Sequence, residues 1–339
     1  MNQKYSHINR ISLFIILIAL IVLPIVAVTI GRFHISVRQF FAALFPAFFP
    51  DEDVPLTVHN VIFNIRLPRI LLALLAGAGL SVAGAAFQAL FSNPLATPDT
   101  LGVATGASFG AVLGILFKFP SWGIQLAALA AGIIAVILVY AVSRVRGSSS
   151  IIMIVLAGMV IGALFSALVS LIKYVADPQD VLPTITFWLL GSLSGTTKLT
   201  LLQGSPFIIA GTLLIFFLRW KLNLMTLNED EAISLGVPVK RIRLLVILGA
   251  TMITASVVSM CGLIGWVGLL IPHISRMIYG NNNKSVIPAS IGLGALFMLF
   301  IDTLARSVSG TEIPVSILTS IIGAPFFIIL LRKTGGIQI

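Results

Sequence analysis

The sequence predicts an all-α integral membrane protein that crosses the bilayer about ten times. Three observations predict this fold class. The 339 residues are 58% hydrophobic, their mean hydropathy is +1.10, and only 9% of them are charged. A soluble domain needs far less apolar sequence than this to fill one core. Apolar runs about as long as a membrane-spanning helix, roughly 20 residues, recur between short polar breaks.

The first predicted helix covers residues 11–30, a run without a charged residue. A secretory signal peptide is the alternative for such an N-terminal segment. The apolar region of a signal peptide is shorter, however, and no clear small-residue cleavage site follows this run. We therefore expect residues 11–30 to be retained as the first membrane span.

Nine further spans are expected, each bounded by polar breaks. They cover residues 67–91, 100–117, 123–143, 151–172, 200–218, 244–261, 264–279, 286–305 and 313–331. With the N-terminus in the cytoplasm, most Lys and Arg residues fall on the cytoplasmic side, as the positive-inside rule requires. Both termini are then cytoplasmic, and residues 1–339 form one transmembrane domain. The same topology accounts for the net charge of +10 without a nucleic-acid partner.

The order of the spans predicts an inverted internal repeat. Spans two to five and spans seven to ten form two blocks whose starting points are five spans apart. Because that offset is odd, the blocks face opposite ways, an arrangement typical of transporters with a central path. The two blocks share almost no residue-level similarity, so this prediction depends on topology alone.

Glycine spacing predicts how closely the helices pack. Gly102, Gly106, Gly110 and Gly114 recur every four residues and therefore line one face of a helix. Such a stripe lets a neighbouring backbone approach closely, although it could also line a pore. We favour the packing interpretation.

Several chemistries are missing from the sequence. No GxxxxGK[ST] motif occurs, so the chain is not expected to bind and hydrolyse ATP itself. The four histidines are scattered and Cys261 is the single cysteine, which predicts no metal site. We expect neither enzymatic activity nor a cofactor of the chain's own.

An ion-coupled secondary transporter is the competing function class. Such a transporter needs titratable groups within its spans, and Asp302 is the clear candidate. Arg306 follows one helical turn later, a spacing that favours a structural ion pair. The secondary transporter therefore remains an alternative with little support.

The segment "NEDEAISLGVPVKRIR", residues 228–243, concentrates charge in a chain that otherwise avoids it. Asn228 can cap a helix whose first turn is acidic, and Gly236 can end that helix in a left-handed conformation. Pro238 suits the start of a second short helix, "VKRIR". We expect two short helices in a cytoplasmic loop that is longer than a simple connection requires.

These motifs together resemble a known family. The chain is similar, from about residue 10 to 335, to the FecCD-type permease subunits of ABC importers for iron-siderophores, haem and cobalamin. The similarity is carried by segments that include "RLPR" (66–69), "SNPLATP" (92–98), "EAISLGV" (231–237), "GLIGWVGLLIPHISR" (262–276) and "DTLAR" (302–306). The resemblance implies the type II ABC importer permease fold.

The resemblance also implies a coupling site for an ATPase subunit in the cytoplasmic loop. The two short helices of residues 228–243 would sit in a cleft of that subunit, with apolar residues filling the cleft and charges fixing the register. The implied coupling residues are Glu231, Ala232, Ser234, Leu235, Gly236 and Val237.

Two further sites follow from the resemblance. Arg66, Arg69 and Arg306 match arginines that receive acidic residues of a binding protein, although they could instead anchor span ends at lipid headgroups. A cytoplasmic gate is implied at Asn93, Leu95, Ser149 and Ser150. Prolines near Asn93 would equally suit an ordinary turn there.

The implied assembly is an importer in a bacterial inner membrane. Its expected partners are two ATP-binding ATPase subunits, a second permease copy or a paralogue, and an extracellular substrate-binding protein. The default cargo is a ferric siderophore; haem, cobalamin and oxyanions are alternatives. Three positions depart from the family pattern, namely Leu263, Trp266 and Ser316, and we expect them to affect local packing of spans eight and ten.

Overall fold

The computed structural model describes residues 2–50, 52–144, 151–227, 229–308 and 310–333. These residues form helices and no strands, as the sequence predicts. The elements are α1 (Asn2–Thr29), α2 (Val37–Leu44), η1 (Pro46–Phe48), α3 (Leu56–Asn60), η2 (Val61–Arg66), α4 (Leu67–Leu90), η3 (Pro98–Leu101), α5 (Val103–Leu116), α6 (Ser121–Ser143), α7 (Ile151–Val175), α8 (Val181–Leu189), α9 (Lys198–Leu218), α10 (Lys221–Leu224), α11 (Glu229–Ser234), α12 (Val239–Cys261), α13 (Val267–Tyr279), α14 (Asn283–Ser307) and α15 (Val315–Lys333).

Each predicted span corresponds to a helix, but not every helix is long enough to cross a bilayer by itself. In the described part of the chain, seven helices have the length and hydropathy of a membrane span. The helices α5 and α15 are shorter apolar helices, and α13 has 13 residues. A count of ten full spans is therefore not established by helix length.

Two predicted boundaries were wrong. The predicted second short helix over "VKRIR" is the beginning of α12, which runs unbroken from Val239 to Cys261 because no Pro or Gly separates Arg243 from the apolar run. The predicted start at residue 264 is three residues too early, since residues 262–265 and Trp266 are not helical and α13 begins at Val267. Gly262 and Trp266 both have positive φ, which helix geometry does not allow.

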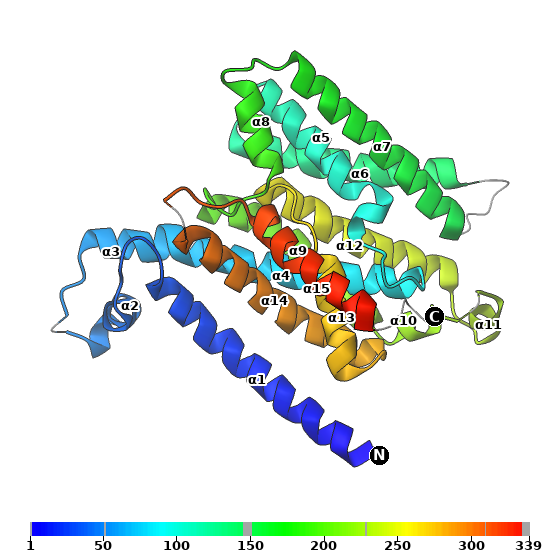
Figure 1. Ribbon diagram of the computed structural model, residues 1–339, viewed down its shortest axis with the longest axis horizontal. Helices are drawn as coiled ribbons and strands as arrows, with labels where there is room; N and C mark the ends of the chain where they lie inside the picture. The colour runs from blue at the N-terminus through cyan, green and yellow to red at the C-terminus, as the bar shows by residue number, and fades with distance from the viewer. Residues whose placement is uncertain (1, 51, 145–150, 228, 309, 334–339) are drawn as a thin grey trace.

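The helix α4 lies at the centre of the molecule and packs against α9, α12, α13 and α14 (Figure 1). Small residues make this possible. A methyl group at Gly84 would overlap the backbone carbonyl of Gly268, and one at Gly77 would overlap that of Gly294. In the same way, Gly110 faces a backbone carbonyl of α6. The glycine stripe of α5 therefore serves close packing, as predicted, rather than lining a pore.

The helix contacts support an internal repeat of opposite orientation. The contact of α4 with α13 has its counterpart in the contact of α12 with α5, and the contact of α4 with α14 has its counterpart between α12 and α6. The pairs α5–α6 and α13–α14 also correspond. Along the chain, α4 runs from the end that carries α2 and α3 toward the end that carries α11, and α12 runs the opposite way (Figure 1).

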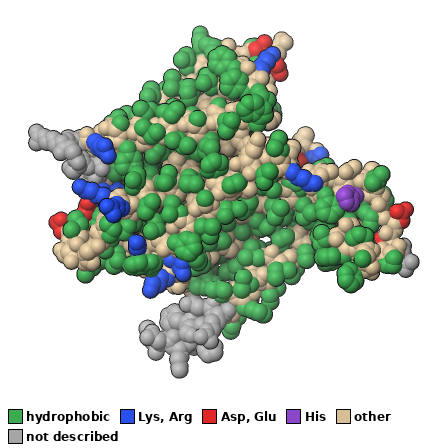
Figure 2. Space-filling view, turned by 180° about the vertical axis from the view of Figure 1, so that it is seen from behind, with side chains coloured by type: hydrophobic (Ala, Val, Ile, Leu, Met, Phe, Trp, Pro, Cys, Tyr) green, Lys and Arg blue, Asp and Glu red, His purple; other side chains and the backbone are tan. Residues whose placement is uncertain are grey.

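The surface is predominantly apolar between its two ends. Hydrophobic side chains cover the middle of the face in Figure 2, whereas Lys, Arg, Asp and Glu gather toward the ends. The helices α1 and α7 expose many large apolar side chains, for example Phe14, Ile21, Ile152 and Val160. A continuous apolar surface of this kind suits contact with lipid or with other spanning helices.

Candidate coupling, docking and gate sites

The helix α11 ends at Gly236 in the way the sequence predicts. The amide of Gly236 donates to the carbonyl of Ile233 at 2.8 Å, and the amide of Val237 donates to that of Ala232 at 3.0 Å. Gly236 has φ +76°. These two bonds and the left-handed glycine form a Schellman motif, which stops the helix after six residues. The predicted cap residue Asn228 lies outside the described residues.

The implied coupling residues divide between two faces. Ala232 and Val237 are buried in the main core of this chain, so they hold α11 in place and present nothing to a partner. Ile233 and Leu235 are 54% and 65% exposed. Glu231, Ser234 and Gly236 are exposed on the same segment. The surface available to a partner is therefore narrower than the six residues predicted from sequence.

Side-chain bonds tie the coupling segment to the spanning helices. Arg243, which is buried in the first turns of α12, donates to Glu229 of α11 at 2.9 Å. On the other side, Asn223 of α10 donates to Asn282 at 2.8 Å and accepts from the backbone amide of Asn283 at 2.8 Å. The helix α11 is thus bonded to α12, and the preceding helix α10 is bonded to the residues that begin α14.

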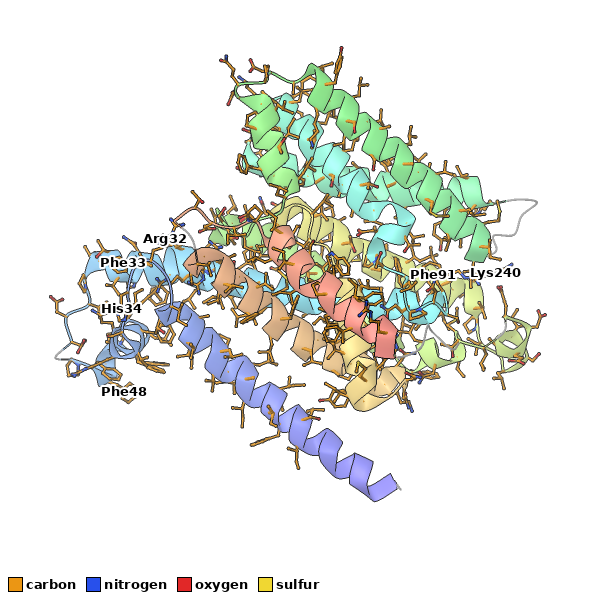
Figure 3. The ribbon with its side chains drawn as sticks, in the orientation of Figure 1. Arg32, Phe33, His34, Phe48, Phe91 and Lys240 are labelled. Atoms are coloured by element: carbon orange, nitrogen blue, oxygen red, sulfur yellow. The ribbon has the colours of Figure 1, made fainter. Side chains whose placement is uncertain are left out.

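The predicted gate residues Asn93 and Leu95 lie in the connection between α4 and η3. The Asn93 side chain accepts from the amide of Leu95 at 2.9 Å, which folds the connection into a turn, and Leu95 is 48% exposed. Phe91, which begins this connection, and Lys240 of α12 lie at the same end of the molecule (Figure 3). The other two predicted gate residues, Ser149 and Ser150, lie outside the described residues.

Two residues that the sequence reasoning missed join the end of α4, from which this connection starts, to α13. Arg276 of α13 donates to the side-chain oxygen of Gln88 and lies within reach of the carbonyl of Ala85. The amide nitrogen of Gln88 lies 3.4 Å from the carbonyl oxygen of Leu269. A glutamine within the apolar run of residues 67–91 was the available sequence signal, because a polar side chain in such a run needs a partner.

The predicted docking arginines are buried inside this chain. Arg69 donates to Asp302 and to Glu312, both at 2.8 Å. Arg306 lies 3.7 Å from the other oxygen of Asp302, on the next turn of α14. Asp302 is fully buried, so its charge is compensated within the protein. The structure therefore assigns Asp302 to the structural ion pair that its spacing predicts.

Arg66 and Arg306 together cap the C-terminal end of α1. Arg66 donates to the carbonyls of Val28 and Phe33, and Arg306 donates to those of Ala27 and Ile30. The last carbonyls of a helix have no partner within it, and cationic side chains satisfy them well. The three docking candidates are only 6–7% exposed, so they connect α1, α4 and α14 beneath the surface.

Residues 16–333 match the family described as the FecCD transport family. The chain belongs to the FecCD transport family. A FecCD relative in Haemophilus influenzae, the molybdate import system permease protein MolB, is 41% identical over 95% of both chains. A probable iron chelatin transport system permease protein of Helicobacter pylori is 35% identical over 95% of this chain and 98% of its own length. This FecCD chain is thus the permease subunit of an ABC importer.

A similar solved structure agrees with the fold. It is described as an inward-facing conformation of a putative metal-chelate type ABC transporter, and it matches with a TM-score of 0.86 and 39% identity over 95% of this chain and 98% of its own. The three departures from the FecCD pattern lie close together. The Ser316 hydroxyl donates to the carbonyl of Leu263, and Trp266 packs against Gly323 of α15. The departures thus affect packing where predicted.

Proposed function

We propose that this permease forms the path for a ferric chelate, which an extracellular binding protein delivers and a separate pair of ATPase subunits drives inward. The support is the coupling segment. It contains a short helix with an exposed Ile233–Leu235 surface that is bonded to α12, and the preceding helix α10 is bonded to the beginning of α14. A cleft in an ATPase would receive these apolar residues, with the surrounding charges at its rim.

The cargo proposal is supported by the relatives and by the hydroxyl groups in and after α8. One relative is named for iron chelatin transport, and the similar solved structure is titled as metal-chelate type. The α8 region and the residues after it present hydroxyl groups, among them Ser192 and Ser194, which bond to each other at 2.8 Å. Neutral hydroxyl walls suit passage of a bulky chelate without tight binding, which leaves selection to the binding protein.

Molybdate is the second candidate cargo. The permease named for molybdate is more similar to this chain than the one named for iron chelatin, 41% against 35% identity. A small oxyanion could pass the same neutral walls.

Reconstitution in lipid vesicles with the cognate ATPase and binding protein tests the function and the cargo together. We expect uptake of labelled ferric chelate that needs ATP and the binding protein and persists with an ionophore. Uptake of labelled molybdate, without uptake of the ferric chelate, would identify molybdate as the cargo. Uptake that persists without ATP and collapses with the ionophore would identify a secondary transporter and overturn the importer mechanism.

We further propose a dimer of permeases in a bacterial inner membrane, with both termini in the cytoplasm and the Asn93–Leu95 turn at the cytoplasmic gate. The beginning of α1 and the end of α15 lie toward the same end of the molecule as α11, which supports this orientation (Figure 1). A protease that enters only from the cytoplasmic side of membrane vesicles should therefore cleave within residues 228–243.

The buried arginines lead to a specific expectation for docking. Replacing Arg66 by Glu should lower the affinity of the binding protein by about tenfold at low salt, with a smaller effect at high salt. The reason is that the exchange releases the α1 carbonyls that Arg66 holds and places a negative charge just beneath the surface on which an acidic partner would dock. Arg38→Glu is the matched control, because Arg38 is 68% exposed and pairs only with Glu52 among the described residues. Unchanged affinity of a folded Arg66→Glu protein at low salt would refute the docking role.

A further inference from the structure

The side of α2 and η1 that faces away from the core is apolar. Val37 and Leu44, seven positions apart, lie on one face of α2 and are 52% and 39% exposed. Just beyond that helix, Phe45 and Phe48 are 47% and 81% exposed, and their rings meet edge to face with centroids 6.4 Å apart. These four side chains, the α2 patch, belong to the connection between α1 and α4 and not to a spanning helix.

The opposite side of α2 is fixed to the core of this chain. Phe40 is 5% exposed and belongs to a buried cluster with Ile35 and Val58. The helix begins with a reciprocal cap, in which the Ser36 hydroxyl oxygen accepts from the amide of Gln39 and the Gln39 side-chain oxygen accepts from the amide of Ser36, both at 3.1 Å. Because one face of α2 is held in this way, the α2 patch is directed outward.

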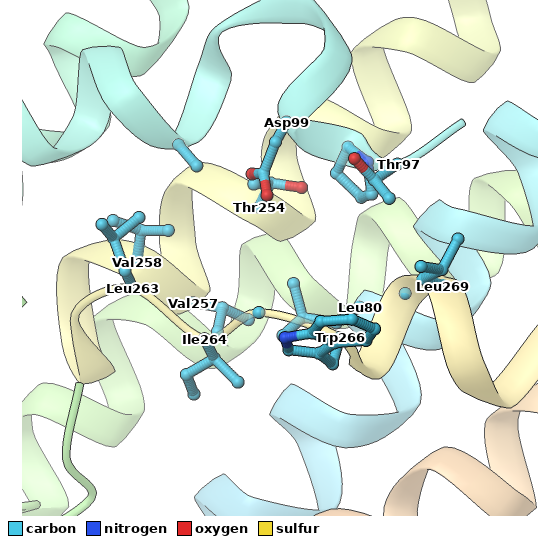
Figure 4. A pocket seen from close by; sticks show the side chains of 14 residues that line it. Leu80, Thr97, Asp99, Thr254, Val257, Val258, Leu263, Ile264, Trp266 and Leu269 are labelled. Atoms are coloured by element: carbon cyan, nitrogen blue, oxygen red, sulfur yellow. The ribbon is translucent and has the colours of Figure 1, made fainter. Parts of the chain in front are cut away.

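The α2 patch is separate from the cavity between α4, η3 and α12. That cavity has a volume of about 220 Å³, and its walls include Leu80, Thr254 and Trp266 (Figure 4). None of the described residues that line it belongs to α2 or η1. Exposed apolar side chains that gather in a patch mark a contact with a partner or a membrane. The α2 patch is therefore expected to be covered from outside the chain.

The α2 patch lies beside the end of α1, at the border of the molecule. The helix α1 packs against α2, and only 11% of the residues in its apolar span are buried, the lowest share among the seven candidate spans of the described chain. Ile30 and Phe33, which are 42% and 45% exposed, continue this apolar surface from α1 toward α2. In Figure 3, Phe48 lies at the edge of the molecule, on the flank along which α1 runs. The α2 patch thus continues the surface that α1 presents to lipid.

We propose that the α2 patch is an interfacial anchor, which inserts into the headgroup layer of the membrane leaflet in which α1 ends. Amphipathic segments bind at this level by burying aromatic and aliphatic side chains about 5–10 Å deep, at the boundary between headgroups and acyl chains. Continuity with the lipid-facing surface of α1 favours lipid over a water-soluble binding protein as the occupant. That this leaflet is the outer one rests on the proposed orientation of the permease.

The charged residue of α2 fits the same layer. Arg38 has a side chain that is 68% exposed, and it pairs with Glu52 at 2.7 Å. A long cationic side chain at a membrane surface lays its stem along apolar groups and keeps its charged end among the headgroups. The α2 patch can therefore insert without drawing Arg38 into the hydrocarbon.

Fluorescence quenching of the full-length permease in phospholipid vesicles tests the anchor. The variant Phe48→Cys carries an environment-sensitive nitrobenzoxadiazole label, and Asp53→Cys, at an exposed site of the same connection, carries it as the matched control. Wild type is the labelling control, because its single cysteine, Cys261, is 2% exposed. One quencher is a lipid with a nitroxide near the headgroup boundary, and the other is iodide in the water. Compared with the label at 53, we expect the label at 48 to be quenched at least about twofold more by the lipid and about twofold less by iodide.

Adding charge to the α2 patch provides the second measurement. With the label placed at Leu44→Cys, the further changes Phe45→Glu and Phe48→Glu should raise its quenching by iodide at least about twofold, because carboxylates resist burial among acyl chains. The thermal unfolding temperature should stay unchanged, since both phenylalanine side chains are exposed and Phe40 still packs in the core.

Three outcomes would overturn the anchor. Equal iodide quenching of the labels at 48 and 53 would leave the α2 patch in water. Shielding of the label at 48 from both quenchers would place a second permease copy over the patch. Shielding from iodide that begins only when the cognate binding protein is added would assign the patch to that protein. None of these outcomes depends on whether ferric chelate uptake is found.

Discussion

Replacing Asp302 by Ala is expected to destabilise this permease by about 3–5 kcal/mol, the usual cost of removing one member of a buried ion pair. Asp302 is fully buried between Arg69 and Arg306, whose side chains are 9% and 8% exposed. Removing the carboxylate leaves two buried cations with a net excess of positive charge. Because the same arginines connect α1, α4 and α14, we expect a large fall in the thermal unfolding temperature in detergent.

Two matched variants make this expectation specific. Asp302→Asn keeps an oxygen that can accept from Arg69, so it should lose less stability than Asp302→Ala. The double variant Asp302→Leu with Arg69→Met removes opposite charges together and should recover part of the loss. A thermal unfolding temperature of Asp302→Ala equal to that of the exposed control Asp53→Ala would show that the network contributes little.

Replacing Gly236 by Glu is expected to abolish ATP-driven uptake while the protein still folds into the membrane. A Cβ atom at Gly236 would meet no other atom of this chain within 4 Å, so the added side chain projects into open space. In the assembled importer that space would belong to the ATPase subunit, where a large buried charge prevents docking. Uptake should fall by at least about tenfold, the effect of roughly 1.4 kcal/mol in coupling.

Gly236→Ala is the control for this experiment. Alanine and glutamate share the strain of positive φ at this position, about 1–2 kcal/mol, but alanine adds little bulk. We therefore expect Gly236→Ala to keep most of its uptake. An equal loss of uptake in both variants would mean that the disturbed end of α11 alone explains the effect. Unchanged uptake in both variants would show that Gly236 does not contact the ATPase subunit.

The helical membrane fold could be predicted from sequence because its signals are local. An apolar run long enough to span a bilayer forms a helix there, because the backbone must satisfy its own hydrogen bonds. Glycines spaced four residues apart in α5 lie on one face of that helix. The end of α11 at Gly236 was predictable for the same reason, because glycine readily adopts the left-handed conformation that ends a helix. The continuation of "VKRIR" into α12 was missed because the polar and apolar parts of one helix look like separate elements in sequence.

The candidate sites were predictable as segments but not as surfaces. Sequence placed Ala232 and Val237 beside Leu235 in one docking segment, and only the fold shows that the first two are buried in this chain's own core. Likewise, "RLPR" predicted positive charge at a span end, whereas both its arginines bond internally. Burial depends on contacts between residues far apart in sequence, so no local pattern reports it.

The sequence by itself determined the membrane location, the family, the approximate helix boundaries and the left-handed glycine that ends α11. Tertiary structure decided which charges pair, as Arg69 does with Asp302 across 233 positions, and which apolar side chains of α11 are buried, as Ala232 is. The physical reason is that the cost of a charge in a protein depends on the groups that surround it in space. Those groups come from helices that only the fold brings together.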